Sequence, residues 1–206
     1  MNASLEQRLG EACTRTEIAD LIQRWGFCRD QGRWLALADT FHSEGTIAVS
    51  WFQGMFSDFV AASRARFGGG VFTKHFMTGS AIELRAGRAI AETNVILAWR
   101  ARLDGMDALG QAYFRFLDRI EARQGAWRIL RRAAIYESDW AAPANPGEQL
   151  RLDEGLLASC PAACRYLAYR LSRGGLSVAP DLPAAGSAAE RALRSEAERW
   201  LEEGTC

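Results

Sequence analysis

The fold is decided by a stretch that begins the second third of this 206-residue chain: Thr73-Lys74-His75-Phe76-Met77-Thr78-Gly79-Ser80-Ala81-Ile82-Glu83. Its β-branched and aromatic residues predict a strand. The stretch contains one of only two histidines and the only lysine. Histidine is the side chain whose unperturbed pKa lies near neutrality, so His75 is the first candidate for a catalytic base.

Three tight turns follow this strand and divide the chain up to Trp140 into four long strands. The turns are predicted at Arg85-Ala86-Gly87, Asp104-Gly105 and Gln124-Gly125. The strands are predicted over residues 72–84, 89–103, 108–123 and 127–140. Strands this long indicate a strongly curved antiparallel sheet wrapped round helices.

The residues before the sheet alternate between helical and strand patterns. Thr14-Arg15-Thr16-Glu17 has the form of a capping box, so we expect a helix from there to Asp30. The remaining expectations are a short helix over 34–41, a turn at 43–45, a strand over 46–52, and a helix over 55–67 that Gly68-Gly69-Gly70 ends. The order predicts an α+β domain in which the curved sheet wraps around the N-terminal helices.

The last third has a different composition. Residues 141–147 contain two prolines and a glycine and predict a linker, and helices are expected over 161–172 and 187–203. An apolar stripe on the last helix indicates that it docks on its own domain or on a neighbouring subunit. We therefore expect a domain over residues 1–140 and a helical extension over 141–206.

Composition excludes several classes of protein. Basic and acidic residues number 25 each, which gives no indication of a nucleic-acid or anionic-membrane partner. No secretory signal is visible, and no apolar run approaches the roughly 18 residues of a membrane span. Five scattered cysteines fit a reduced, cytoplasmic protein. Metal-ligand spacings and dinucleotide motifs are both missing from the sequence, so no metal or cofactor is expected.

Three groups of residues carry a resemblance to a known family. They are Ile18-Ala19-Asp20-Leu21-Ile22 with Cys28-Arg29-Asp30-Gln31-Gly32-Arg33-Trp34, then Phe72-Thr73-Lys74-His75-Phe76, and Gly125-Ala126-Trp127-Arg128-Ile129 with Arg132 and Asp139-Trp140. Over residues 12–140 the chain resembles the SnoaL-like branch of the nuclear-transport-factor-2-like (NTF2-like) superfamily. The resemblance implies an α+β cone around a deep pocket, a fold shared by dehydratases, a dehydrochlorinase, lyases of lignin-derived diaryl compounds, and binding modules.

The resemblance also implies a site. In eliminating members an aspartate at the end of the first helix holds a histidine that removes a substrate proton, and Asp30 and His75 fall at those places. Arg132 falls where members carry a pocket or structural arginine. The sequence departs from the pattern with Trp25 and Phe116 near positions that are often tyrosine, and with Gly79 where asparagine is common. These departures imply fewer hydroxyl donors than a typical dehydratase has.

Each of these residues also has a structural interpretation. His75 could be a core histidine satisfied by a backbone carbonyl. Asp30 opposes the macrodipole at its helix end, which pairing with an imidazole or with Arg29 or Arg33 would offset. Arg132 could orient an anionic or phenolic substrate or form a buried ion pair. The second histidine, His42, is expected to be solvent-exposed.

Together these observations favour a cofactor-independent lyase that acts on a small aromatic substrate, with His75 as general base held by Asp30. The predicted substrate-binding residues are Arg132, Trp25, Trp51, Phe59, Met77, Asn94 and Tyr113. Leaving groups under consideration are water and formaldehyde. An isomerase or cyclase on the same fold and a non-enzymatic ligand-binding module are the alternatives, and self-association into a homo-oligomer is expected.

Overall fold

The computed structural model describes residues 4–69 and 72–204, and its first helix, α1, spans Leu5–Asp30. Ser4 caps it, with its hydroxyl accepting from the Gln7 amide and the Gln7 side chain accepting from the Ser4 amide. The prediction of a start at Thr14 was wrong, because this earlier box satisfies the free amide groups of the helix end. The hydroxyl of Thr16 instead donates to Ala12 O inside the helix.

Two short helices and two strands follow α1. Their bounds are α2 Trp34–Ala38, β1 Phe41–Val49, β2 Phe52–Met55 and α3 Phe56–Ala65. The expected turn at residues 43–45 lies within β1, where an irregular register between Phe41 and Thr46 absorbs it. A Cβ at Gly45 would lie 2.9 Å from His42 O, so this irregular segment requires a glycine. Gly70, the last residue of the expected helix stop, lies outside the described residues.

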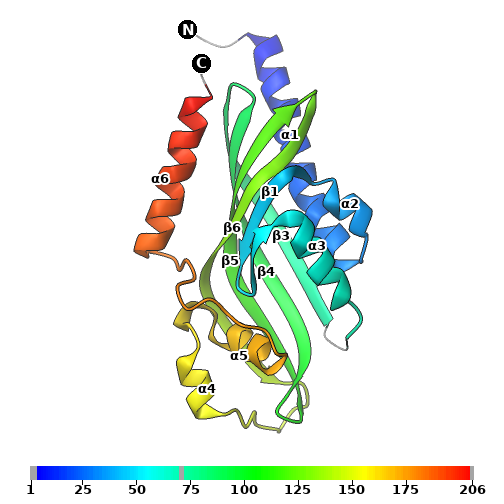
Figure 1. Cartoon of the computed structure of the whole chain (residues 1–206), viewed down its shortest axis with the longest axis vertical. Helices are drawn as coiled ribbons and strands as arrows, with labels where there is room; N and C mark the ends of the chain where they lie inside the picture. The colour runs from blue at the N-terminus through cyan, green and yellow to red at the C-terminus, as the bar shows by residue number, and fades with distance from the viewer. Residues whose placement is uncertain (1–3, 70–71, 205–206) are drawn as a thin grey trace.

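The four long strands are β3 Phe72–Arg85, β4 Arg88–Leu103, β5 Met106–Arg123 and β6 Ala126–Pro143. The three predicted turns join them, with positive φ at Ala86, Asp104 and Gln124 and at the glycine after each. The sheet order is β2-β1-β6-β5-β4-β3, and the sheet curls without closing (Figure 1). All neighbours are antiparallel except β1 and β6, which are parallel.

Helices α1 to α3 cover the concave face of the sheet (Figure 1). The apolar stripe of α1, formed by Ile18, Leu21, Ile22 and Trp25, is almost completely buried there. Burial of this stripe removes large apolar side chains from water and fixes α1 along β3. The end of α1, which carries Asp30, is thereby held beside the start of β3.

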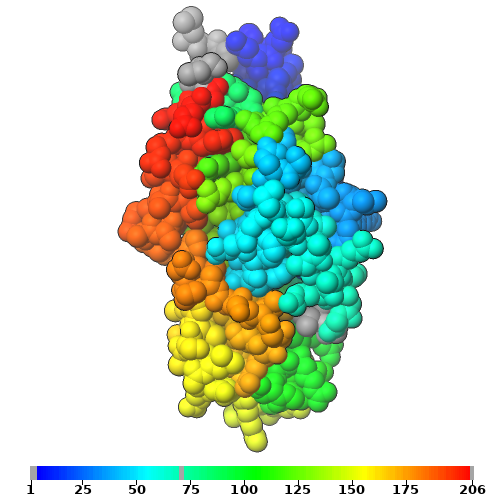
Figure 2. All heavy atoms as spheres, in the orientation of Figure 1, coloured from blue at the N-terminus to red at the C-terminus, as the bar shows by residue number. Residues whose placement is uncertain are grey.

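The C-terminal extension divides between the two faces of the sheet. Strand β6 continues to Pro143, three residues into the predicted linker, and is followed by α4 Glu154–Ser159, the 3-10 turn η1 Ala162–Cys164, α5 Arg165–Arg173 and α6 Ala188–Glu203. Helix α6 packs on the convex face of its own sheet, with Ala197 and Leu201 against Ile90, Leu117 and Ile135. Helix α5 closes the wide end of the cone, where Leu167, Ala168, Tyr169 and Leu171 are buried. Figure 2 shows the atoms of α4 and α5 in yellow and orange at this end of the molecule.

Within the described residues no helix is long and apolar enough to cross a membrane. Cys13, Cys28, Cys160 and Cys164 are free thiols, and Cys206 lies outside the described residues. His42 is buried rather than solvent-exposed, with 8% of its surface accessible. Its Nε2 lies 3.0 Å from Glu121 O, so the turn in which it was placed is part of the sheet.

Candidate active site

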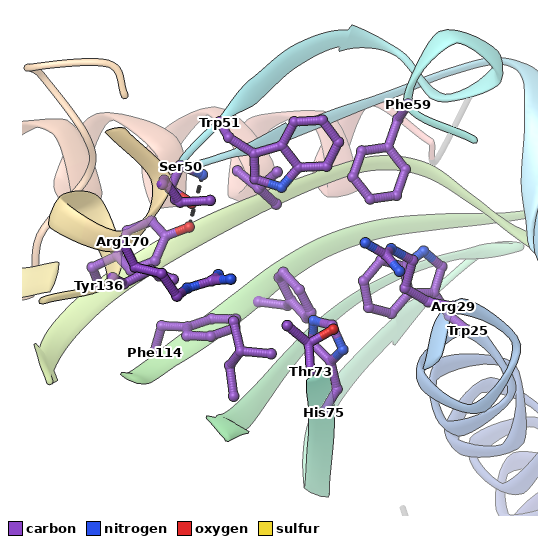
Figure 3. Close-up of a pocket in the computed structure, with 15 residues that line it drawn as sticks. Trp25, Arg29, Ser50, Trp51, Phe59, Thr73, His75, Phe114, Tyr136 and Arg170 are labelled. Atoms are coloured by element: carbon purple, nitrogen blue, oxygen red, sulfur yellow. Dashed lines mark hydrogen bonds between the residues drawn. The ribbon is translucent and has the colours of Figure 1, made fainter. Parts of the chain in front are cut away.

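A cavity of about 70 Å³ lies inside the wide end of the cone, and we call it the inner cavity. Helices α1, α3 and α5, strands β1 and β3 to β6, and the turn after β1 contribute its walls. The lining is mostly apolar and comprises Trp25, Arg29, Val49, Ser50, Trp51, Phe59, Thr73, His75, Leu97, Phe114, Phe116, Tyr136, Leu167, Arg170 and Leu171 (Figure 3). A concave, aromatic site with few polar groups is typical of small-molecule pockets.

His75 and Asp30 meet at the edge of this cavity. His75 Nδ1 lies 2.6 Å from Asp30 Oδ1, and the His75 backbone N–H donates to Asp30 Oδ2 at 2.7 Å. Both carboxylate oxygens are therefore engaged by one residue, which fixes the imidazole in position. The arrangement places a proton on Nδ1 and leaves Nε2, which bonds to none of the described residues, with a free lone pair.

The surroundings of His75 favour its neutral form. Burial lowers the pKa of His75 below its usual value, and the hydrogen bond and negative charge of Asp30 only partly oppose this effect. The positive charges of Arg29 and Arg132 lower the same pKa further. A neutral imidazole with a free Nε2 is the form that can accept a proton near neutral pH.

Aromatic rings hold the imidazole from one side. Trp25 contacts His75 edge to face, with ring centroids 5.4 Å apart, and contacts Phe116 in the same way at 5.3 Å. Trp51 and Phe59 continue the wall, with centroids 5.4 Å apart. Such pairs restrict rotation of the rings and keep water away from the imidazole.

Tyr136 lies across the inner cavity from the aromatic wall (Figure 3). Its hydroxyl oxygen accepts from the Ser50 backbone N–H at 2.8 Å, and its own proton has no acceptor among the described residues. Burial raises the pKa of Tyr136, so the phenol remains protonated. The strand spacing of Arg132, Ala134 and Tyr136 could have predicted this inward face. Tyr136 adds to the cavity a hydroxyl group that was not predicted from the sequence.

A larger space of about 750 Å³, the outer cavity, adjoins the inner one. Five residues line both cavities and mark the passage between them: Arg29, Trp51, Thr73, Arg170 and Leu171. Arg170 belongs to α5, in the extension that the sequence analysis separated from the domain. Neither Arg29 nor Arg170 was predicted as a substrate-binding residue, and no local sequence pattern indicates that α5 packs over the cone.

Three of the predicted pocket residues line the inner cavity, namely Trp25, Trp51 and Phe59, and four do not. Arg132 is fully buried and donates to Asp118 through Nε at 2.7 Å and Nη2 at 2.6 Å. Its guanidinium carbon lies 4.5 Å from the Trp25 ring centre and 4.2 Å from that of Phe116. Arg132 thus forms a structural ion pair behind the aromatic wall.

The other three residues are turned away by the geometry of the strands. Met77 packs against Gly26 of α1. Asn94 is exposed on the convex face, and Tyr113 lies on the face opposite Phe114, where its hydroxyl donates to Gln111. Gly79 was expected to share a face with His75, but an irregular register between Met77 and Ser80 turns it to solvent.

Among residues 4–69 and 72–204, no group of three histidine, cysteine, aspartate or glutamate side chains is placed to hold a metal ion. The side chains with polar groups that line the inner cavity supply an imidazole, a phenol, two hydroxyls, two indole N–H groups and two guanidinium groups. This set can accept a proton, donate a hydrogen bond and attract an anion.

Two curated relatives come from the fungus Fusarium vanettenii. Pea pathogenicity protein 2 is 28% identical over 176 residues, 84% of this chain and 76% of that protein. A PEP2-like protein is 30% identical over 176 residues, 82% of this chain and 74% of that protein.

Solved structures share the fold. A candidate scytalone dehydratase from Novosphingobium aromaticivorans has a TM-score of 0.55 at 17% identity and covers 68% of this chain and 97% of its own. A type 2 hexachlorocyclohexane dehydrochlorinase has a TM-score of 0.55 at 14% identity and covers 70% of this chain and 97% of its own. This fold is used by enzymes that convert small molecules and by ligand-binding proteins. Residues 10–133 match the family described as SnoaL-like domain, so the chain belongs to the SnoaL-like family within the NTF2-like superfamily, as its sequence predicted.

Proposed function

We propose that this protein is a cofactor-independent lyase in which His75 removes a proton from a small aromatic substrate. The observation that carries the proposal is the short contact between His75 Nδ1 and Asp30, at 2.6 Å, on the edge of an aromatic cavity. Asp30 fixes the tautomer, leaves Nε2 free, and stabilises the imidazolium that forms when the proton arrives. General-base catalysis of this kind contributes about 10²- to 10⁴-fold in rate.

The proposed reaction is an elimination. His75 Nε2 takes a proton from a carbon, the electron pair of the broken C–H bond forms a double bond, and the leaving group departs with its own bonding pair. Tyr136 donates a hydrogen bond to that departing group, and the proton held by His75 completes it as a neutral molecule. When formaldehyde is a product, His75 takes the proton from a hydroxyl group instead. Cleavage of the adjacent carbon–carbon bond releases formaldehyde. The electron pair of that bond forms the double bond and expels the hydroxyl group of the next carbon, which leaves as water.

The names of two similar solved structures support this class of reaction. Dehydration and dehydrochlorination, the activities named for the two similar structures, are both eliminations that begin with loss of a proton. The aromatic lining of the inner cavity, with Trp25, Trp51, Phe59 and Phe116, supports an aromatic substrate. We place the reaction in cytoplasmic aromatic catabolism.

We also propose that the chain forms a homo-oligomer. Phe27 on α1 and Phe72 and Phe76 on β3 each expose more than half of their surface, and such rings favour burial against a second copy. Size-exclusion chromatography with light scattering measures the mass of the protein in solution. A monomer at micromolar concentration would contradict this part of the proposal.

Replacement of His75 by alanine tests the reaction. We expect turnover of 1-arylethanols or 1,2-diarylpropane-1,3-diols to fall at least about 100-fold, because the base is lost. Mass spectrometry of the product identifies the class, since elimination lowers the mass by one water or by one water and one formaldehyde. An isomerase or cyclase would leave the mass unchanged.

Asn94→Ala is the matched control, because Asn94 is exposed on the convex face and its loss should leave turnover unchanged. Full activity in His75→Ala would remove the proposed base. Binding of these alcohols without conversion by the wild-type protein would favour the ligand-binding module.

A further inference from the structure

The lining of the two cavities carries more positive than negative charge. Five arginines are among the described residues that line the cavities: Arg29, Arg66, Arg102, Arg170 and Arg173, of which Arg173 forms ion pairs with Asp104 and Asp153. Asp30 is the one acidic residue in the same lining, and both of its oxygens are engaged by His75. The carboxylate at the site is therefore committed to holding the base.

Arg170 lacks the partners that a buried guanidinium normally has. Its Nε is buried without a hydrogen-bond acceptor among the described residues, and it forms no ion pair with any of them. Its guanidinium carbon lies 5.4 Å from the Trp99 ring centre, and the group points into the inner cavity (Figure 3). A buried guanidinium nitrogen without an acceptor costs free energy, so its position at a cavity wall points to a ligand that supplies the acceptor.

Arg29 reaches the same space from α1. Its guanidinium carbon lies 6.0 Å from the Phe59 ring centre, and like Arg170 it forms no ion pair within the described residues. Burial lowers the pKa of Arg170 to about 10, and the positive charge of Arg29 contributes to the decrease. An anion placed between two positive charges at a cavity wall offsets the repulsion between them.

We propose that Arg29 and Arg170 form an anion site that selects aromatic substrates bearing a carboxylate. The ring of such a substrate would occupy the inner cavity beside His75, and its carboxylate would lie in the passage between the two guanidinium groups. Arginine suits this task because its planar donors match the two oxygens of a carboxylate. This inference names the substrate class of the proposed lyase and rests on that function, but its test requires no turnover.

The test compares two small aromatic probes by calorimetry at constant ionic strength. Benzoate and benzamide have nearly the same shape and differ in charge. We expect the wild-type protein to bind benzoate at least about 10-fold more tightly than benzamide, as charge-assisted hydrogen bonds require. Arg29→Gln and Arg170→Gln should each weaken benzoate binding by about 10- to 100-fold.

Two controls distinguish a direct contact between arginine and carboxylate from a general effect of positive charge and from misfolding of the variants. Arg102→Gln removes an exposed positive charge from the outer cavity and should change benzoate affinity less than about two-fold, as a screened charge does. Benzamide should bind the Arg170 variant as it binds the wild type, which would establish that the cavity is intact.

Equal affinities for benzoate and benzamide, unchanged benzoate affinity in both arginine variants, or no binding of benzoate would each overturn the anion site. The two proposals fail separately. His75→Ala should retain benzoate binding, so a loss of turnover without a loss of affinity supports both. Full turnover in that variant removes the base and leaves the anion site standing.

Discussion

At the scale of single residues, Asp30 fixes the position of the His75 imidazole. Its two oxygens bind the imidazole Nδ1 and the backbone amide of the same residue. Position and tautomer are therefore set by one side chain. The lowered pKa of His75 places the change of charge below the usual value of an imidazole.

We predict the effect of this arrangement on the pH dependence of kcat/KM. In the proposed function the neutral imidazole is the active base, so the acidic limb of the wild-type profile should lie below about pH 6.5. Asp30→Asn removes the influences that raise the pKa of His75, so the limb should move to still lower pH. The plateau should fall about 100-fold or more, because the amide no longer stabilises the imidazolium.

The pH–rate profiles of both proteins, measured over the same range, test this prediction. An acidic limb that moves to higher pH in Asp30→Asn would contradict the assigned contact. A plateau equal to that of the wild type would show that the base works without its partner.

At the scale of the elements, the sequence predicted the long strands better than the faces of their side chains. Two-residue hairpin turns need positive φ, which glycine adopts readily, so the Asp-Gly and Gln-Gly pairs predicted the turns at 104–105 and 124–125. The irregular register between Met77 and Ser80 includes Gly79, and an isolated glycine inside a strand often marks such an extra residue, a signal that the prediction of a regular alternating strand did not use. His75 precedes the irregular segment and lies beside Asp30, whereas Gly79 lies within that segment and is turned to solvent.

Close packing between strands β4 and β5 gives an element-scale prediction. A Cβ at Gly110 would overlap Trp99 Cζ2 and would lie 2.6 Å from Trp140 O, a clash that involves backbone. Gly110→Ala should lower the free energy of unfolding by about 2 kcal/mol or more.

Gly79→Ala is the control for this change, since no atom lies within 4 Å of its added Cβ and its φ is not positive. Its free energy of unfolding in urea should stay within about 0.5 kcal/mol of the wild type. Equal effects of the two substitutions would mean that the contact with Trp99 does not limit packing.

At the scale of the whole molecule, the C-terminal extension serves two separate purposes. Helix α5 completes the cavity through Leu167, Arg170 and Leu171, whereas α6 covers Ile90, Leu117 and Ile135 on the convex face. The apolar stripe predicted that α6 packs against another surface, but it did not indicate which surface. Contacts between distant parts of a chain depend on three-dimensional shape, so the place of Arg170 had no signal in the sequence.

Deletion of residues 187–206 tests this division. We expect a lower melting temperature, because apolar side chains of the convex face become exposed. Benzoate affinity should stay within about two-fold of the full chain, since no cavity residue is removed. A loss of affinity in a variant with an intact circular dichroism spectrum would show that α6 supports the cavity.

The position of α5 also has a consequence for biosynthesis. The strands β3 to β6 are joined by tight turns and pair with their neighbours in sequence order, whereas α5 joins them only after a long connection. A nascent chain that has emerged as far as Pro143 contains the histidine and its aspartate but no helix over the wide end. During synthesis both residues of the proposed proton-accepting pair therefore emerge before the helix that encloses the cavity, so the enclosed site can assemble only after α5 has been made.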